Sequence, residues 1–189
     1  ITNTAASYKS ERRGVVLCCL PRTIDGAVAY LAAAHAGHAI ILASPDASNM
    51  EELVDAYRPE WIVTGYALDN NNYEQKDWPS SSLTLYECKQ AGGEVHPDFY
   101  LMLLTSGSTG SSKGVRLSYH NMASNCTAIV KSLSLDDKAT ALGHLPLSYS
   151  FGLSVLHMQL ASGGRIALSD ESMMGGGLWA MAREQEVTL

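Results

Sequence analysis

Residues 105–114 carry the side chains of this chain that are best suited to chemistry. The segment reads Thr105-Ser106-Gly107-Ser108-Thr109-Gly110-Ser111-Ser112-Lys113-Gly114. Its glycines allow tight turns and close approach of the backbone to a ligand. Hydroxyl and backbone N–H groups are hydrogen-bond donors to oxyanions, and the lysine adds a mobile positive charge. This combination predicts a cradle for a polyphosphate.

Two common nucleotide-binding motifs do not fit this segment. A P-loop requires Gly before its lysine and Ser or Thr after it, whereas Ser112 precedes Lys113 and Gly114 follows it. The dinucleotide-binding pattern G-x-G-x-x-G is absent as well, and no helix is expected to open directly after the loop. The polyphosphate cradle is therefore of another class.

The first half of the chain alternates between expected strands and helices. The strands are expected at Val15–Leu20, Ala39–Leu42 and Trp61–Thr64, and the helices at Thr23–Ala36 and from Ser48 to a point before Pro59. The short helix opens with the capping-box sequence Ser-Asn-Met-Glu. This order predicts an α/β fold, a mostly parallel sheet with helices on both faces and right-handed crossovers.

The second half continues the alternation on both sides of the loop. The polar stretch Asp69–Ser82 indicates a surface connection. Further strands are expected at Leu83–Tyr86, Phe99–Leu104, Val115–Leu117, Thr140–Leu145 and Arg165–Leu168, and helices at Ser118–Leu133, Phe151–Ala161 and Leu178–Gln185. Val187–Leu189 would begin one more strand, so the pattern is expected to continue beyond the last residue.

Composition excludes several classes of protein. The chain has 189 residues, with 13 Lys and Arg against 19 Asp and Glu, a net charge of -6. This balance argues against nucleic acid or an anionic membrane as the main partner. Apolar residues make up 46%, enough for a core and too many for a disordered chain. The uncharged stretch Gly26–Ala43 is rich in alanine and contains two histidines and Gly37, so no membrane span is expected.

Neither the cysteines nor the histidines form a recognisable reactive cluster. The four cysteines, Cys18, Cys19, Cys88 and Cys126, lack C-x-x-C spacing and are interpreted as reduced, structural thiols of a cytoplasmic protein. His35 and His38 lie three residues apart, but no Cys or carboxylate at metal-ligand spacing joins them. The sequence therefore assigns no residue to a metal.

Residues 104–115 resemble the phosphate-loop signature of the adenylate-forming (AMP-binding) superfamily, T-S-G-[ST]-T-G-x-P-K-G-V. This superfamily includes acyl-CoA ligases, fatty acyl-AMP ligases, luciferases and the adenylation domains of peptide synthetases. The matching positions are Thr105, Ser106, Gly107, Ser108, Thr109, Gly110, Lys113, Gly114 and Val115. Ser112 stands where the family usually has Pro.

A second segment resembles the next motif of the family, L-P-L-x-H-x-x-G. It reads Leu145-Pro146-Leu147-Ser148-Tyr149-Ser150-Phe151-Gly152, with Tyr149 in place of the usual His. The resemblance implies that Tyr149, Phe151 and Gly152 lie beside the acyl substrate. Ordinary packing at a helix entrance is the alternative for Tyr149 and Phe151.

The resemblance implies an ATP-dependent enzyme that activates a carboxylic acid. The carboxylate attacks the α-phosphorus of ATP, which gives acyl-AMP and pyrophosphate, and a thioester with CoA or an acyl carrier protein then follows. Thr105, Ser106, Gly107, Ser108, Thr109, Gly110 and Lys113 would bind ATP, and Lys113 would be catalytic. Mg²⁺ would bridge phosphate oxygens.

Several parts that the family needs are absent from these 189 residues. No Y-G-x-T-E or T-G-D segment and no late catalytic lysine is found. Residues 1–189 are therefore expected to be part of the large N-terminal domain, without the C-terminal domain, and to have no ligase activity alone. A non-catalytic, truncated homologue that binds a nucleotide or acyl group is a second hypothesis. A general nucleotide hydrolase is a third, disfavoured by the failed P-loop match.

Overall fold

The computed structural model describes residues 1–8, 12–46, 48–80, 82–90, 92–105 and 113–189. It divides into two compact units. Unit 1 consists of Ile1–Pro21 and Asp25–Tyr119, and unit 2 of Arg22–Ile24 and His120–Leu189. The loop after β6 (Leu101–Thr105) therefore belongs to unit 1, and the Leu145–Gly152 segment belongs to unit 2.

Unit 1 contains a seven-stranded sheet in the order β4-β5-β3-β1-β2-β6-β7. The strands are β1 (Val15–Cys19), β2 (Ala39–Leu42), β3 (Trp61–Thr64), β4 (Tyr73–Lys76), β5 (Thr84–Cys88), β6 and β7 (Lys113–Leu117). β1 pairs in parallel with β2 and β3, and β2 with β6. The remaining three pairs, β3–β5, β4–β5 and β6–β7, are antiparallel. The expected parallel centre is confirmed, with antiparallel strands at both edges.

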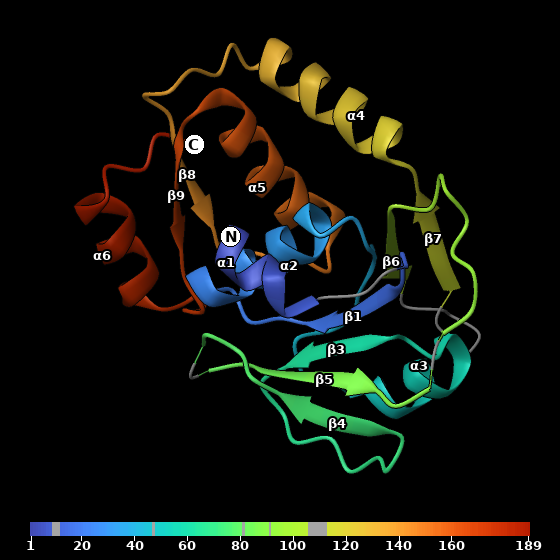
Figure 1. Cartoon of the computed structure of the whole chain (residues 1–189). Helices are drawn as coiled ribbons and strands as arrows, with labels where there is room; N and C mark the ends of the chain where they lie inside the picture. The colour runs from blue at the N-terminus through green and yellow to red at the C-terminus, as the bar shows by residue number, and fades with distance from the viewer. Residues whose placement is uncertain (9–11, 47, 81, 91, 106–112) are drawn as a thin grey trace. The chain divides into compact units, whose positions relative to one another are not determined.

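The helices of unit 1 are α1 (Thr2–Ala5), the 3₁₀ turn η1 (Ala6–Tyr8), α2 (Ile24–His35), whose first residue is assigned to unit 2, and α3 (Met50–Tyr57). α3 packs Met50, Leu53 and Val54 against one face of the sheet. β2 and β3 lie on opposite sides of β1, with α2 connecting β1 to β2 and α3 connecting β2 to β3. Because both crossovers are right-handed, α2 lies on the opposite face of the sheet from α3. Figure 1 shows α2 lying along the strands. The predicted α/β fold with helices on both faces is confirmed.

Strand β4 lies inside the stretch predicted to be only a surface connection, and that prediction was wrong for Tyr73–Lys76. Alternation did not reveal this strand because only Tyr73 is buried, while Glu74 and Gln75 are exposed. Pairing with β5 supplies its backbone hydrogen bonds. The Tyr73 hydroxyl also donates to Pro59 O at 2.7 Å. Tertiary partners thus form a strand that the local sequence does not favour.

His38 joins the N-terminal residues to the sheet and is 3% exposed. Gly14 N–H donates to His38 Nδ1 at 3.1 Å, and His38 Nε2 lies 3.1 Å from Tyr8 O. Since Nδ1 accepts, Nε2 carries the proton and the ring is neutral. The ring centroid also lies 4.3 Å from that of Trp61. His38 is therefore a structural histidine.

We expect the Gly14 hydrogen bond to weaken in acid. Removal from water lowers the pKa of His38 below its ordinary 6.5, and nearby Arg13 lowers it further; this outweighs the hydrogen bond to Tyr8 O and the charge of Glu60, which both raise the pKa. The neutral ring therefore contributes full stability above the unfolded-state pKa of about 6.5, and this contribution is lost as the pH falls from there through the lower pKa of the folded state. Amide hydrogen exchange should show the Gly14 protection factor falling below about pH 6.5. The His38→Gln variant should lack this pH dependence; an equal dependence in both proteins would refute the assignment.

Unit 2 contains β8 (Thr140–Gly143) and β9 (Arg165–Leu168), which pair in parallel. Its helices are α4 (Tyr119–Ser132), whose first residue is assigned to unit 1, α5 (Ser150–Ser162) and α6 (Gly176–Glu184). Residues 187–189 are not a regular strand. Even so, Leu189 N–H donates to Thr140 O at 3.2 Å and Leu142 N–H to Leu189 O at 3.0 Å. The expected strand at Val187–Leu189 is therefore not formed in the structure, although these residues make isolated backbone hydrogen bonds to β8.

The four cysteines are free thiols, with Cys18 and Cys19 buried in β1. Burial raises the pKa of Cys19 to about 12, which keeps this thiol protonated and unreactive at neutral pH. None of the helices in the described part of the chain combines the length and apolar character needed to cross a bilayer.

Candidate functional site

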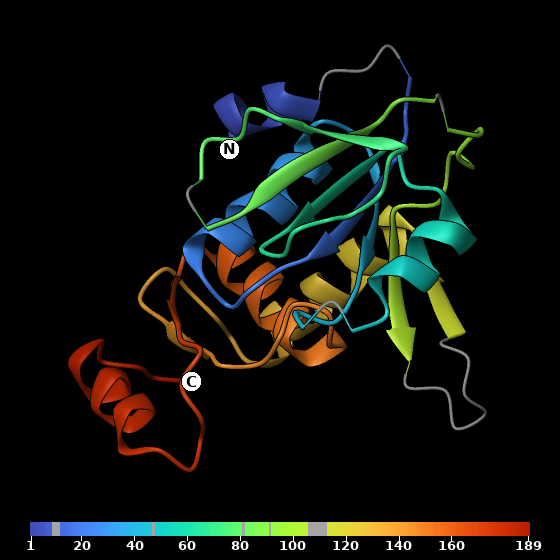
Figure 2. The same ribbon diagram turned by 90° about the horizontal axis from the view of Figure 1, so that it is seen from below.

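Strands β6 and β7 form an antiparallel hairpin that holds both ends of the hydroxyl- and glycine-rich loop. Their register pairs Thr105 with Lys113 and Leu104 with Gly114. The loop therefore leaves β6 immediately after Thr105 and returns at Lys113. Figure 1 shows β6 and β7 side by side, and Figure 2 gives the same hairpin from below. Two of the predicted phosphate-binding positions are thus brought together by strand pairing.

Gly114 fits closely against the sheet core beneath the loop. A Cβ atom at this position would lie 2.3 Å from Met102 Sδ and 2.9 Å from Met102 Cγ. Met102 itself is buried among core residues that include Leu17 and Ile41. The missing side chain at Gly114 therefore lets β7 pass over Met102 and places the exposed Lys113 at the mouth of the hairpin.

The remaining residues of the predicted cradle lie outside the described residues. These are Ser106, Gly107, Ser108, Thr109 and Gly110. For Thr105, the structure gives the backbone position at the end of β6. What is established is the frame: a paired strand end on each side and a lysine on the returning strand. A lysine ammonium group at such a position is chemically suited to an oxyanion.

In unit 2, Tyr149 and Phe151 stand at the entrance of α5. Tyr149 N–H donates to Pro146 O at 3.0 Å, and Leu153 N–H donates to Tyr149 O at 3.0 Å. Tyr149 has an extended backbone and is the residue that precedes the helix. Both side chains are largely exposed, Tyr149 by 64% and Phe151 by 65%. Packing within the described residues thus leaves most of both side chains accessible to a ligand.

Gly152 is enclosed by the backbone of the same motif. A Cβ atom at Gly152 would lie 2.4 Å from Pro146 O and 2.6 Å from Leu145 O. The first turn of α5 therefore approaches the Leu145–Pro146 segment so closely that only glycine fits. This glycine fixes the path of the backbone on which Tyr149 and Phe151 are carried.

An apolar cavity of about 850 Å³ adjoins α5 within unit 2. Phe151, Val155 and Met158 contribute one side of it, and Trp179 of α6 another. His144 also lines it, and its buried Nδ1 has no hydrogen-bond partner among the described residues. Neither Tyr149 nor Gly152 is among the lining residues. The cavity therefore includes only Phe151 of the three residues predicted to lie at the acyl substrate.

Sequence reasoning missed His144 and Trp179 as cavity residues. The spacing of Phe151, Val155 and Met158 matches one face of a helix and could have indicated a shared surface. His144 and Trp179 are 35 residues apart (179 minus 144), and only the tertiary structure places both in the lining of one cavity. No local pattern could have joined them.

The described residues contain no group of three or more His, Cys, Asp or Glu side chains that could hold a metal ion. No residue of the described chain is therefore assigned to Mg²⁺.

Known proteins resemble this chain in sequence and in fold. D-alanine--D-alanyl carrier protein ligase of Listeria monocytogenes serotype 4b is 34% identical over 76 residues, which cover 40% of this chain and 15% of that protein. O-succinylbenzoate coenzyme A synthetase from Bacillus subtilis, solved with AMP, has a TM-score of 0.71 and 20% identity, over 99% of this chain and 51% of that one. ATP-bound MatB from Rhodopseudomonas palustris has a TM-score of 0.65 and 17% identity, over 87% and 37%.

These similarities concern the fold and only part of each relative's length. The structures show a shared fold, and this chain spans between 15% and about half of the length of these three relatives. The family described as AMP-binding enzyme matches residues 4–189, which is nearly the whole chain. The chain therefore belongs to the AMP-binding enzyme family, as the two sequence motifs and the α/β fold indicate.

Proposed function

We propose that this chain is the ATP-binding and acid-binding part of an enzyme that activates a carboxylic acid as its acyl-AMP, with release of pyrophosphate. Family membership over residues 4–189 supports an ATP-dependent, acid-activating enzyme. The single observation that carries the assignment is the β6–β7 hairpin, which pairs Thr105 with Lys113 across a loop of family sequence.

The β6–β7 hairpin is suited to reduce the unfavourable electrostatic interactions of this reaction. A carboxylate and ATP are both anionic, and negative charge develops on the departing pyrophosphate. Preorganised donors and a positive charge near the phosphates offset both effects. We assign Thr105, Ser106, Gly107, Ser108, Thr109 and Gly110 to the β- and γ-phosphates, and Lys113 to charge neutralisation as the catalytic residue. Mg²⁺, when bound to ATP, adds positive charge at the phosphate oxygens.

The entrance of α5 is the proposed place of the acid. The exposed Tyr149 hydroxyl is suited to a hydrogen bond, and Phe151 borders the apolar cavity of unit 2. Gly152 would act through the backbone, because its close approach to Leu145 and Pro146 leaves no room for a side chain. This arrangement favours an acid with an apolar portion that contacts Phe151.

The later acceptor of the acyl group is proposed to be CoA or an acyl carrier protein. One relative is a ligase of a carrier protein and another is a coenzyme A synthetase. Each of them is longer than this chain, so the complete reaction requires more than these residues. We expect the 189-residue chain to bind ATP without catalysing carboxylate-dependent exchange between ATP and pyrophosphate. Exchange by this chain that Lys113→Ala abolishes would contradict this expectation.

Lys113→Ala tests the proposed phosphate site directly. Loss of a charge-assisted contact should weaken ATP binding by about tenfold or more, which corresponds to about 1.4 kcal/mol. AMP lacks the β- and γ-phosphates, so its affinity should change little. Isothermal titration calorimetry of both nucleotides would measure the difference. Lys131→Ala is the matched control, since Lys131 is an exposed lysine of α4 in unit 2.

The outcomes also separate the two remaining functions. Unchanged ATP affinity in Lys113→Ala would overturn the phosphate assignment. Binding that depends on Lys113, together with exchange activity in a longer chain containing these residues, would support the ligase. The same binding with no exchange in the longer chain would favour a non-catalytic binding module.

A further inference from the structure

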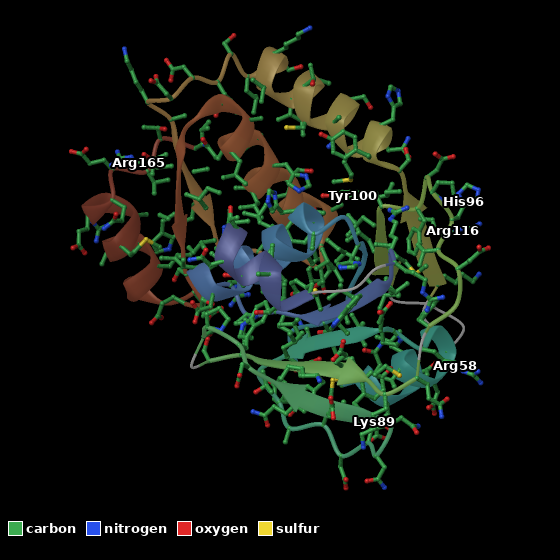
Figure 3. The ribbon with its side chains drawn as sticks, in the orientation of Figure 1. Arg58, Lys89, His96, Tyr100, Arg116 and Arg165 are labelled. Atoms are coloured by element: carbon green, nitrogen blue, oxygen red, sulfur yellow. The ribbon has the colours of Figure 1, made fainter. Side chains whose placement is uncertain are left out.

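A polar cavity of about 540 Å³ lies in unit 1, bordered by the last turn of α3 and by the chain on either side of the β4–β5 pair. Asp55 lies in α3 and Arg58 directly follows this helix, Asn70 and Asn72 precede β4, and Gln90 follows β5. Figure 3 labels Arg58 at the end of α3. None of the residues assigned to ATP or to the acid lines this cavity, so it represents a separate feature of the chain.

Arg58 occupies a backbone conformation that normally favours glycine. It ends α3 in the left-handed region, with φ 44° and ψ 57°, and its N–H donates to Val54 O at 2.9 Å. Residues with a Cβ atom are disfavoured relative to Gly in this conformation. Ser134 and Glu186 are the other described non-glycine residues with positive φ, and of the three only Arg58 borders this cavity.

The two opposite charges of the cavity are not paired with each other. Asp55 and Arg58 are three residues apart, yet no ion pair joins them in the described structure. Their side chains also make no hydrogen bond to any other described residue. Both residues are exposed and border one cavity, so each charged group can take a partner from a ligand.

Hydrogen bonds connect the segment before β4 with the end of β5. Lys89 holds the segment before β4, because its N–H donates to Asn72 O at 2.8 Å and its Nζ to Asn71 O at 2.8 Å. Asn70 Oδ1 accepts from Asn72 N–H at 3.0 Å, which leaves the Asn70 side-chain NH₂ as a donor for a ligand.

We propose that this cavity binds a small zwitterion that carries one carboxylate and one ammonium group, the chemistry of a free amino acid. The Arg58 guanidinium would take the carboxylate, assisted by the amide groups of Asn70 and Gln90. The Asp55 carboxylate would take the ammonium group. A lone anion would meet the negative charge of Asp55 and a lone cation the positive charge of Arg58, so either half alone binds more weakly.

The test uses the 189-residue chain and three probes: glycine, acetate and methylammonium. Backbone amide signals of Asn70, Asn72, Tyr73 and Gln90 would be followed by NMR during each titration. We expect saturable shifts with glycine at an affinity at least about tenfold higher than with acetate or methylammonium. Absence of saturable shifts with glycine, or acetate binding as tightly as glycine, would overturn the proposal.

Charge-removing variants locate the binding to the two side chains. Arg58→Gln and Asp55→Asn should each weaken glycine binding by about tenfold. Two matched controls should leave it unchanged: Arg116→Gln on the exposed strand β7 and Glu52→Gln on the exposed part of α3. Equal glycine affinity in Arg58→Gln and in Arg116→Gln would refute the assignment of the carboxylate to Arg58.

Discussion

Gly152→Ala is expected to destabilise the Leu145–Gly152 motif by about 3 kcal/mol. The added Cβ would lie 2.4 Å from Pro146 O and 2.6 Å from Leu145 O, and these are backbone atoms that cannot rotate away. Pro146 O also accepts the hydrogen bond from Tyr149 N–H. Relief of the clash would therefore break this bond and displace Tyr149 and Phe151 together.

Amide hydrogen exchange in α5 would measure the effect where it occurs. The Leu153 amide, which donates to Tyr149 O, should lose protection in Gly152→Ala. Gly176→Ala is the matched control, because a Cβ there would meet no atom within 4 Å. Alanine at that helical position should be neutral or slightly stabilising. Equal protection in the two variants would show that the approach at Gly152 is not tight.

Arg13→Ala is the second substitution with a large expected effect, about 2 kcal/mol on the stability of unit 1. The guanidinium donates to Gly37 O at 3.0 Å, to His96 O at 3.0 Å and to Pro97 O at 2.7 Å, and also to Phe99 O. These carbonyls belong to the segments that lead into β2 and β6. Arg13 thus connects the start of β1 with the segments that precede β2 and β6.

Arg13→Lys separates geometry from charge. Lysine keeps the positive charge but lacks the planar fork of donors, so it should recover less than half of the stability lost in Arg13→Ala. Urea unfolding followed by the fluorescence of Trp61 and Trp78, in a Trp179→Phe background, would report on unit 1. Full recovery by lysine would indicate that charge alone is important at this position.

The sequence predicts the centre of the fold well because its strands are continuous apolar runs. Val15–Cys19, Ala39–Leu42 and Trp61–Thr64 are strands in the structure as expected, and α2 lies within the predicted Thr23–Ala36 helix. The edges are less predictable. β4 is formed by pairing and by the buried Tyr73, and the N-terminal helix residues before Tyr8 show no periodic pattern.

The candidate site, like the fold, is only partly predictable from the sequence. The loop motif names Thr105 and Lys113, and antiparallel register brings the two together. The cavity beside α5 depends on His144 and Trp179, and the zwitterion cavity on Asp55, Asn70 and Gln90. Each of these sets joins distant segments, so only tertiary structure reveals it.

The central claim is that the β6–β7 hairpin receives a polyphosphate. NMR titration of the chain with tripolyphosphate, which has neither base nor ribose, tests this claim most directly. We expect saturable shifts of the Thr105, Lys113 and Gly114 amides, and their loss in Lys113→Ala. Saturable binding with these three signals unchanged, or with shifts confined to unit 2, would contradict it.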